Sequence, residues 1–311
     1  ALRLLAFLFA ARVFAAAPSS TPVRQSQLSG AVISHARRIP PTLGYARAQD
    51  NNHLLTEALG LYAAGCSLPD HPQAKRWQAL GWRWANNALQ RQIDAHGVYT
   101  QHSTNYHRLM LQAAICLQAL AAAQGQNLPQ PTLERLKAAV RWLAAYFDPH
   151  SGKAANLGHN DGAHILPLAG GDFGDYQPVL QAAGQAFLGP SLLGSGPWNE
   201  PALWFNLDSG SAPPSPEPLP ASRAVNRLGN SESWGTLRAV QFRGRPAHAD
   251  QLHVDLWWQG HNVARDAGTY HYNLPPTWDN ALAHTSAHNT ITINGQDQMR
   301  RAGRFLWLQR A

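Results

Sequence analysis

The sequence predicts an α+β chain in which a helical domain is followed by a separate β domain. Three observations support this fold class. Apolar residues recur at helical spacing through roughly the first two-thirds of the 311 residues. Residues 211–220 are then dense in proline, which cannot continue a helix. Beyond this stretch, apolar and polar residues alternate with the period of two that a half-buried strand requires.

Residues 1–17 superficially suit a secretory signal, because an apolar run ends in small residues. Arg12 interrupts that run, and no initiator Met precedes it, so we expect the true start of the protein to be missing. The segment instead predicts a packed amphipathic helix. Its apolar stripe at helical spacing comprises Leu2, Leu5, Phe9 and Val13.

Further helical runs are expected over residues 52–66, 72–93 and 107–124. A fourth run follows Thr132, which we expect to cap the helix, and it stops at Asp148 because a proline comes next. Successive helices joined by short loops predict antiparallel hairpins stacked as a bundle or a toroid. The helices alone do not distinguish these two arrangements.

The proline-dense linker, residues 211–221, is the expected boundary between a helical domain over residues 1–210 and a β domain over residues 222–311. Three stretches of the β domain predict strands: the alternating Leu252, Val254, Leu256 and Trp258, the pair Ile291 and Ile293, and residues 305–308. So few strands would not close a sandwich, so we expect the sequence to be truncated at its C-terminus as well.

The composition favours an acidic, sugar-like partner. A formal net charge of +7 suits acidic partners, and the basic residues are dispersed, which is atypical of a nucleic-acid binder. The 11 Trp and 15 His of the chain are more informative, because aromatic faces stack on sugar rings and imidazoles serve metals and proton transfer. No segment has the uninterrupted apolar length that a membrane span requires.

Two polar clusters fall at expected loop-to-helix junctions, where a helical scaffold presents functional groups. Asn51-Asn52-His53 is the first, and capping explains only one of its residues. Tyr106 follows Asn52 by 54 residues, within the polar segment 101–108. These residues are candidates for one functional rim.

A third cluster lies in the expected β domain. His248, Asp266 and His288 supply two imidazoles and a carboxylate, an ordinary ligand set for zinc if the fold brings them together. The alternative is that these are three unrelated loop residues with local hydrogen bonds.

These clusters resemble the heparinase II/III-like polysaccharide lyases over nearly the whole chain. The resemblance rests on six segments in the family's order: Asn51-Asn52-His53, Ser103-Thr104-Asn105-Tyr106-His107, residues 156–162, His248-Ala249-Asp250, Asp266-Ala267-Gly268-Thr269-Tyr270 and Ala287-His288-Asn289-Thr290. It implies an incomplete (α/α) toroid followed by an antiparallel β-sandwich domain. It also implies cleavage of an acidic, uronate-containing glycan by β-elimination, and a periplasmic or secreted location.

The resemblance assigns roles to individual residues. Asn52 and His53 match the groups that neutralise the uronate carboxylate, which must be stabilised when the C5 proton leaves. Tyr106 matches the catalytic tyrosine, which acts as base, as acid or as both. The structural Zn²⁺ ligands of the family match His248, Asp266 and His288. Apart from the resemblance, residue chemistry predicts substrate contacts, because Arg pairs with carboxylate or sulfate and Asn binds hydroxyls. The candidates are Asn51, His107, Arg108 and Asn160, with Asp161 as a further one.

Two departures from the family pattern concern the chemistry. Pro246 stands where members commonly have a second catalytic His, and Ala267 stands where some alginate-cleaving members have a tyrosine. Either Tyr106 serves both proton transfers or another group substitutes. The candidates for that substitution are His102, His107, His253 and Tyr270.

Other interpretations of these residues remain open. Arg108 is also compatible with a solvated helix face, and residues 160–162 with a turn. A non-catalytic glycan-binding protein is the first alternative function. The second is a glycoside hydrolase, which needs two flanking carboxylates, and nothing in the sequence pairs Glu57, Asp161 and Asp175.

Overall fold

The computed structural model describes residues 1–189, 191–207, 222, 225–242, 246–275, 277–303 and 305–308. The whole of the proline-dense linker, residues 211–221, lies outside this described part. Contacts divide the chain into a first unit, residues 1–92 with 113–132, and a second unit, residues 93–112 with 133–311. This division does not coincide with the domain boundary predicted at the linker. That boundary stays a prediction.

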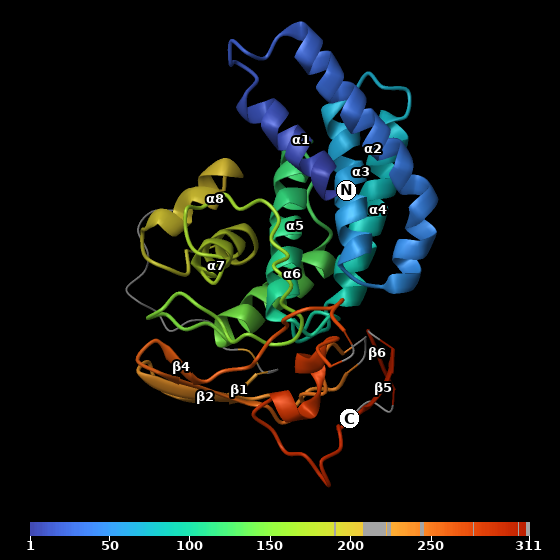
Figure 1. Ribbon diagram of the computed structural model, residues 1–311. Coiled ribbons are helices and arrows are strands. Elements are labelled where there is room, and N and C mark those ends of the chain that lie inside the picture. Colours follow the sequence, from blue (N-terminus) through green and yellow to red (C-terminus); the bar gives the residue numbers. More distant parts are fainter. Residues whose placement is uncertain are drawn as a thin grey trace. The chain divides into compact units, whose positions relative to one another are not determined.

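The first unit is helical. It contains α1 (Leu2–Val13), α2 (Pro22–Gln49), α3 (Asn52–Ser67), α4 (Ala74–Gln92) and the second half of α5 (Thr104–Ala123). Helices α3 and α4 lie side by side (Figure 1). Gly81 makes this close approach possible, because a Cβ there would lie 2.5 Å from the backbone nitrogen of Tyr62. Residues Leu54 to Thr56 and Ala58 to Gly65 of α3 are all buried, so α3 is the centre of the unit.

Three of the four helical runs predicted in the interior match α3, α4 and α5 to within three residues. The fourth matches α6, but α6 (Gln130–Ala145) begins before Thr132, so the predicted cap is wrong. The Thr132 hydroxyl is instead engaged across the first unit: it donates to Asn86 Oδ1 at 2.9 Å and accepts from Gln90 Nε2 at 2.8 Å. A tertiary contact therefore explains this buried threonine.

Helix α1 forms as predicted, but its buried face matches the predicted stripe only at Leu5. Leu4 and Leu5 are the buried residues of α1, whereas Leu2 and Val13 are exposed. Nearly every position of α1 is apolar, so the spacing of apolar residues did not identify the side that packs.

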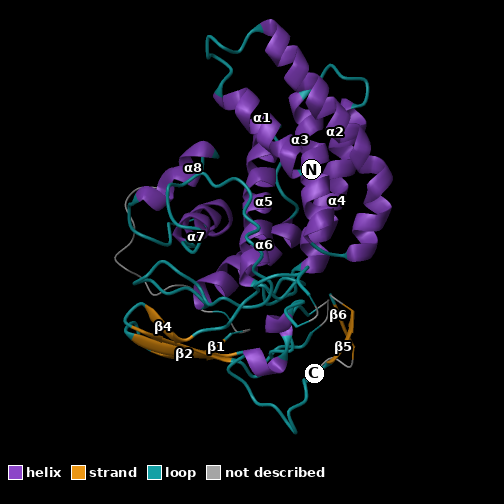
Figure 2. Ribbon diagram, in the orientation of Figure 1, coloured by secondary structure: helices purple, strands orange, loops and turns teal. Residues whose placement is uncertain are grey.

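The second unit joins helices to antiparallel strands. Its helices include α6, α7 (Gln177–Ala183) and α8 (Glu200–Trp204). Four strands form an antiparallel sheet in chain order: β1 (Asn226–Gly229), β2 (Ser233–Leu237), β3 (Val254–Trp258) and β4 (His261–Ala264). A separate antiparallel pair comprises β5 (Arg300–Gly303) and β6 (Leu306–Leu308) (Figure 2).

Strand β3 of the four-stranded sheet buries a carboxylate and a tryptophan on one face and exposes apolar side chains on the other. Asp255 and Trp257 of β3 are buried, and the Trp257 ring stacks on Trp234 of β2 with centroids 5.2 Å apart. Trp234 Nε1 donates to the buried carboxylate of Asp148, 3.1 Å away, which ties the sheet to the segment that follows α6. The apolar alternation that predicted β3 lies on the exposed side, at Leu252, Val254, Leu256 and Trp258.

The other strand predictions have mixed outcomes. Residues 305–308 contain β6, as predicted. The strand predicted at Ile291 and Ile293 is wrong: both side chains are exposed, and the segment forms only an isolated bridge between Ile293 and Gln296. The fold class is confirmed, because a helical region precedes antiparallel strands. None of the helices in the described part of the chain combines the length and apolar character needed to span a bilayer.

Candidate functional site

The start of α5 is held by contacts to a segment more than 50 residues away. Ser103 Oγ accepts from the Tyr106 amide at 3.1 Å, which caps the helix, and donates to the carbonyl of His159 at 2.5 Å. The Thr104 amide donates to the carbonyl of Leu157 at 3.0 Å. Gly158 has a φ of +67°, and a Cβ there would lie 2.4 Å from the carbonyl oxygen of His102. Residues 156–161 are thereby fixed against the first turn of α5.

Tyr106 is brought to a carboxylate by this arrangement. Its hydroxyl donates to Asp161 Oδ2 at 2.7 Å, and the ring is half-buried. Burial, together with the hydrogen bond and the negative charge of Asp161, raises the pKa of Tyr106 above its usual value. Tyr106 is therefore a neutral phenol at physiological pH, paired with a carboxylate.

Tyr272 belongs to the same cluster, and the sequence did not single it out. Burial, and after it the negative charge of Asp161, raises the pKa of Tyr272 above its usual value. The ring packs edge-on against His159 and Phe305, with centroids 5.5 and 5.1 Å away. Only tertiary structure reveals this residue, because Tyr106, Asp161 and Tyr272 are far apart in sequence.

The predicted contact residue Asn160 lies next to this cluster and is half-buried. Its amide nitrogen Nδ2 donates to Asn156 Oδ1 at 2.6 Å, and its backbone nitrogen donates to Thr269 Oγ1 at 3.1 Å. A Cβ on Gly268 would lie 2.3 Å from Asn156 Nδ2, so the two segments pack tightly. Asn160 therefore links the segments that carry Asp161 and Tyr272.

The neighbouring His107 and Arg108 point into the interior of the second unit. His107 stacks on Trp142, and its Nε2 lies 2.9 Å from the carbonyl oxygen of Ala139. Burial lowers the pKa of His107 to about 4. The Arg108 guanidinium lies over the Phe173 and Tyr176 rings and donates to Asn105 Oδ1. Both side chains are buried, which argues against the substrate contacts expected of them and against a solvated face for Arg108.

Asn51, Asn52 and His53 form the junction before α3 in the first unit. Asn51 is the N-cap of α3, and its Oδ1 accepts from the His53 amide at 3.0 Å. Gln92 Nε2 donates to the Asn51 carbonyl at 3.0 Å and to Asp50 Oδ1 at 3.2 Å. The His53 side chain is exposed and that of Asn52 is half-buried. Tyr106 belongs to the second unit.

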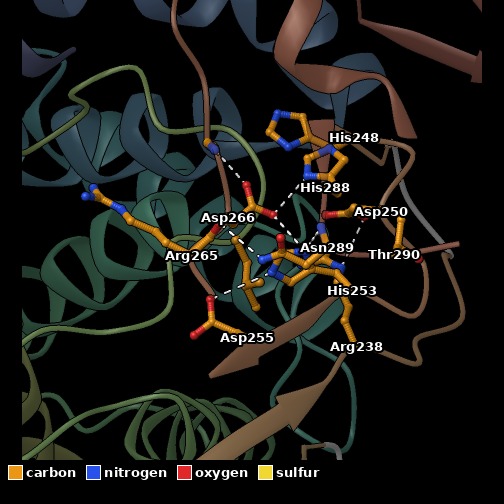
Figure 3. A network of polar contacts seen from close by, with 12 residues as sticks. Arg238, His248, Asp250, His253, Asp255, Arg265, Asp266, His288, Asn289 and Thr290 are labelled. Atoms are coloured by element: carbon orange, nitrogen blue, oxygen red, sulfur yellow. Dashed lines mark hydrogen bonds and ion pairs between the residues drawn. The ribbon is translucent and has the colours of Figure 1, made fainter. Parts of the chain in front are cut away.

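The three predicted metal ligands come together in the second unit (Figure 3). His248, Asp266 and His288 are buried, and one ligand atom from each lies within 4.8 Å of the other two. His288 Nδ1 is 3.0 Å from Asp266 Oδ2. His248 Nδ1 and His288 Nε2 are buried without a hydrogen-bond partner among the described residues. Buried nitrogens of this kind, beside a carboxylate, fit a divalent cation with nitrogen and oxygen ligands.

The protonation states of His248 and Asp266 suit the binding of a cation. Burial lowers the pKa of His248 well below its usual value, so its imidazole is neutral and able to donate a lone pair. Burial alone would raise the pKa of Asp266, but hydrogen bonding with His288 and the histidine charges lower it to about 2. The carboxylate is therefore ionised at neutral pH.

A second layer of buried polar groups surrounds the set (Figure 3). His253 Nδ1 accepts from the Asn289 amide at 3.2 Å and lies 3.5 Å from Asp266 Oδ2, while its Nε2 lies 3.7 Å from Asp255 Oδ2. Arg238 Nε lies 3.3 Å from Asp250 Oδ1. This layer orients Asp266 and holds the loops around it.

The candidates to replace the group expected at Pro246 lie in different environments. His102 and His253 are buried, and His102 packs edge-on against Phe242. Tyr270 is exposed.

Comparison with known families matches both parts of the chain. A model of the heparinase II/III N-terminus matches residues 3–158, and a model of the heparinase II/III-like C-terminal region matches residues 237–311. The first range contains Asn52, His53 and Tyr106, and the second contains the three candidate metal ligands.

Individual relatives are more distant. A heparin-sulfate lyase of Bacteroides thetaiotaomicron is 23% identical over 90% of this chain, which spans 42% of that protein. The structure of a heparinase III has a TM-score of 0.64 at 18% identity, with 96% of this chain and 47% of that one covered. A mutant heparan sulfate lyase from Pedobacter heparinus has a TM-score of 0.55 at 19% identity, with 96% and 45% covered. These likenesses concern the fold, and the chain spans less than half the length of each.

Proposed function

Because this chain belongs to the heparinase II/III family, we propose that it is part of a polysaccharide lyase that cleaves an acidic, uronate-containing glycan by β-elimination. The observation that carries the proposal is the hydrogen bond from the Tyr106 hydroxyl to Asp161 Oδ2, 2.7 Å long. Tyr106 lies in the first turn of α5, which tertiary contacts hold in place. A half-buried phenol with a fixed proton acceptor is suited to proton transfer.

Besides binding the glycan, a β-elimination enzyme must neutralise the uronate carboxylate and transfer protons. The uronate carboxylate resists the negative charge that develops when the C5 proton leaves, so hydrogen-bond donors must neutralise it. Asn52 and His53 supply an amide and an imidazole for that task, and their half-buried and exposed positions leave them open to a ligand. Proton transfer at C5 and at the leaving O4 is the task of Tyr106 and its partners.

The substrate proposed is a glycosaminoglycan of the heparin or heparan sulfate type. The relatives with these names support it, as does the net charge of +7. Asn51 and Asn160 remain the proposed contact residues at the two helix junctions. A periplasmic or secreted location is proposed from the family resemblance alone.

We further propose that His248, Asp266 and His288 hold a zinc ion that clamps the loops of the second unit. The zinc ion would cross-link three chain segments and would not activate the substrate. The test is metal content by mass spectrometry, followed by chelation. Removal of zinc should lower the melting temperature by about 5 °C or more, and zinc but not magnesium should restore it. Unchanged melting in metal-free protein would contradict the clamp.

The lyase proposal is tested by ultraviolet absorbance of the unsaturated uronate product, with heparan sulfate, heparin, hyaluronan and alginate as substrates. Tyr106→Phe should lower the rate about 1000-fold without changing the melting temperature. Tyr45→Phe, an exposed tyrosine on α2, is the matched control and should retain full activity. New reducing ends without absorbance would favour a hydrolase, and binding without any product would favour a glycan-binding protein.

A further inference from the structure

The formal net charge of the chain lies entirely in the first unit. Residues 1–92 with 113–132 contain ten Arg and Lys against three Asp and Glu, a formal charge of +7, whereas the second unit contains fifteen of each kind. All ten cationic side chains lie on α1, α2 and α4, and all ten are exposed. These three helices therefore form the surface on which the positive charge of the protein is in excess.

The protein itself neutralises little of this charge. In the part of the chain that the structure describes, the ten side chains have one ion pair, between Arg91 and Asp50 with the two atoms 3.4 Å apart. An exposed cation without a carboxylate partner keeps its hydrogen-bond donors for a ligand. Repulsion between like charges also raises the free energy of the unbound surface. Binding of a polyanion would remove that repulsion.

Two of these cations are held at one place by an aromatic ring. The guanidinium carbon of Arg47, in the last turn of α2, lies 4.1 Å from the ring centroid of Trp84 on α4. The guanidinium carbon of Arg83 lies 4.7 Å from the same centroid. The contact of Arg47 with Trp84 joins α2 to α4, which both belong to the first unit (Figure 1). Trp84 is half-buried, so a ring anchored in the unit holds two guanidiniums that reach solvent.

A guanidinium that packs on an aromatic ring is prepared for anion binding. The ring covers one flat face and leaves the N–H groups at the edge, which pair with carboxylate or sulfate oxygens. The contact also restricts rotamers that a free arginine would lose on binding. Neither Arg47 nor Arg83 has an ion pair with a described residue. Both guanidiniums are thus positioned without a carboxylate partner.

This pair adjoins the junction that carries Asn52 and His53. Arg47 precedes Asn51, the N-cap of α3, by four residues, about one helical turn. Asp50 lies between them as the C-cap of α2, and it pairs with Arg91 from the last turn of α4. A glycan chain at the junction would have cationic side chains of α2 and α4 beside it.

We propose that Arg47 and Arg83, with the Trp84 ring that holds them, form an anchoring site for a sulfate group of a sulfated glycan, outside the sugar that reacts. The inference rests on the proposed lyase function. A sulfate group has three terminal oxygens and can accept from two guanidiniums at once, whereas one guanidinium already satisfies both oxygens of a carboxylate. The site therefore favours sulfated glycans over hyaluronan and alginate, whose anionic groups are carboxylates.

The closing experiment measures binding of a heparin oligosaccharide by calorimetry, in a Tyr106→Phe background that prevents turnover. Arg47→Gln combined with Arg83→Gln should raise Kd about tenfold or more. Arg12→Gln combined with Arg37→Gln is the matched control, because it removes the same charge from exposed positions on α1 and α2. It should raise Kd less than about threefold. Both double variants should melt within about 2 °C of the parent, because all four side chains are exposed.

Two further measurements identify the ligand group and the geometry. Heparin of the same length without its sulfate groups should bind weakly, and the Arg47→Gln/Arg83→Gln variant should leave its Kd unchanged. Arg47→Lys combined with Arg83→Lys retains both charges but loses the planar donors, so Kd should rise about fourfold. A lysine variant that binds heparin as tightly as the parent would overturn the role of the ring-held guanidiniums.

Other outcomes would refute the site itself. Equal losses in the two glutamine double variants would show that affinity follows net charge alone. Duplex DNA that binds as tightly as heparin, with the same loss in the Arg47→Gln/Arg83→Gln variant, would overturn the assignment to a glycan.

The binding measurements do not depend on turnover, so the two proposals fail separately. If the parent protein forms no unsaturated product from any glycan, the lyase proposal fails, and the heparin affinities still decide the anchoring site. If product does form, the Arg47→Gln/Arg83→Gln variant should raise KM for heparan sulfate more than it lowers kcat. A loss confined to kcat would contradict an anchoring role.

Discussion

The two loop-to-helix junctions that carry the proposed catalytic residues have the same local cap but different surroundings. At α3, the Asn51 side chain accepts from the His53 amide, and at α5, the Ser103 hydroxyl accepts from the Tyr106 amide. Asn51 is half-buried and its junction is joined to nearby Gln92, whereas Ser103 is buried and also bonds the carbonyl of His159. Both junctions have a long-range contact, to Gln92 at α3 and to His159 at α5, but the residue that caps the helix is buried only at α5.

This difference separates two ways of presenting a functional group. The exposed His53 depends on few neighbours and can adjust to a ligand. Tyr106 is fixed by the packing of residues 156–161, so disruption of that segment should affect both stability and the site. Substitutions at the two junctions should therefore differ in size.

The largest expected effect is that of Gly158→Ala. A Cβ at Gly158 would lie 2.4 Å from the carbonyl oxygen of His102, at a φ of +67°. We expect a loss of about 3 kcal/mol in the free energy of unfolding. Gly162→Ala is the control, because its φ of +81° is equally strained but no atom lies within 4 Å. It should cost about 1 kcal/mol. Equal losses in urea denaturation would contradict close packing at Gly158.

A pH-dependent effect is expected at His107. The folded protein keeps this buried imidazole neutral, with a pKa of about 4 against an ordinary value of 6.5. Its contribution to stability is therefore complete above pH 6.5 and is lost as the pH falls towards 4. His107→Phe, which retains an aromatic ring against Trp142, should reduce the stability lost between pH 8 and pH 5 by about 2 kcal/mol. An unchanged pH slope would show that His107 is not the group responsible.

Ser103→Ala should have an intermediate effect. It removes the cap of α5 and the bond to the His159 carbonyl, and both are partly buried. We expect a loss of about 1.5 kcal/mol, measured by urea denaturation, together with lower lyase activity. Ser103→Thr retains the hydroxyl and is the matched variant. A loss confined to activity would argue that the segment 156–161 is held by other contacts.

Asn51→Ala should have the smallest effect on stability. It removes a single cap on a half-buried junction, so we expect about 1 kcal/mol. Asn51→Asp retains the oxygen that accepts from the His53 amide and should be near neutral in stability. If Asn51→Ala were as damaging as Ser103→Ala, the contrast between the two junctions would be wrong.

Much of the helical region could be predicted, because each helix leaves a local record in the spacing of apolar residues and in its end signals. Residues 52–66, 72–93 and 107–124 gave helix bounds within three residues. The three candidate metal ligands were identified by residue type, and the structure brings them together. Their zinc remains a proposal.

Other features could not be predicted, because they depend on contacts between distant segments. Thr132 has the chemistry of a cap but bonds Asn86, and Ile291 and Ile293 alternate without pairing into a strand. Nothing local to Tyr272 distinguishes it from Tyr270, yet Tyr272 is half-buried with its ring against His159, whereas Tyr270 is exposed. Side-chain orientation at such sites is decided by packing, which sequence spacing does not record.

The outward apolar side of the β1–β4 sheet has a practical consequence for handling this polypeptide. Leu228, Val254, Leu256, Trp258 and Val263 are exposed there. Apolar area of this kind is a colloidal liability, since contact between molecules removes it from water. Light scattering should rise with protein concentration and with added ammonium sulfate, which strengthens apolar association. Replacement of Leu256 by lysine should delay that rise while leaving the buried Trp234–Trp257 stack on the opposite side intact.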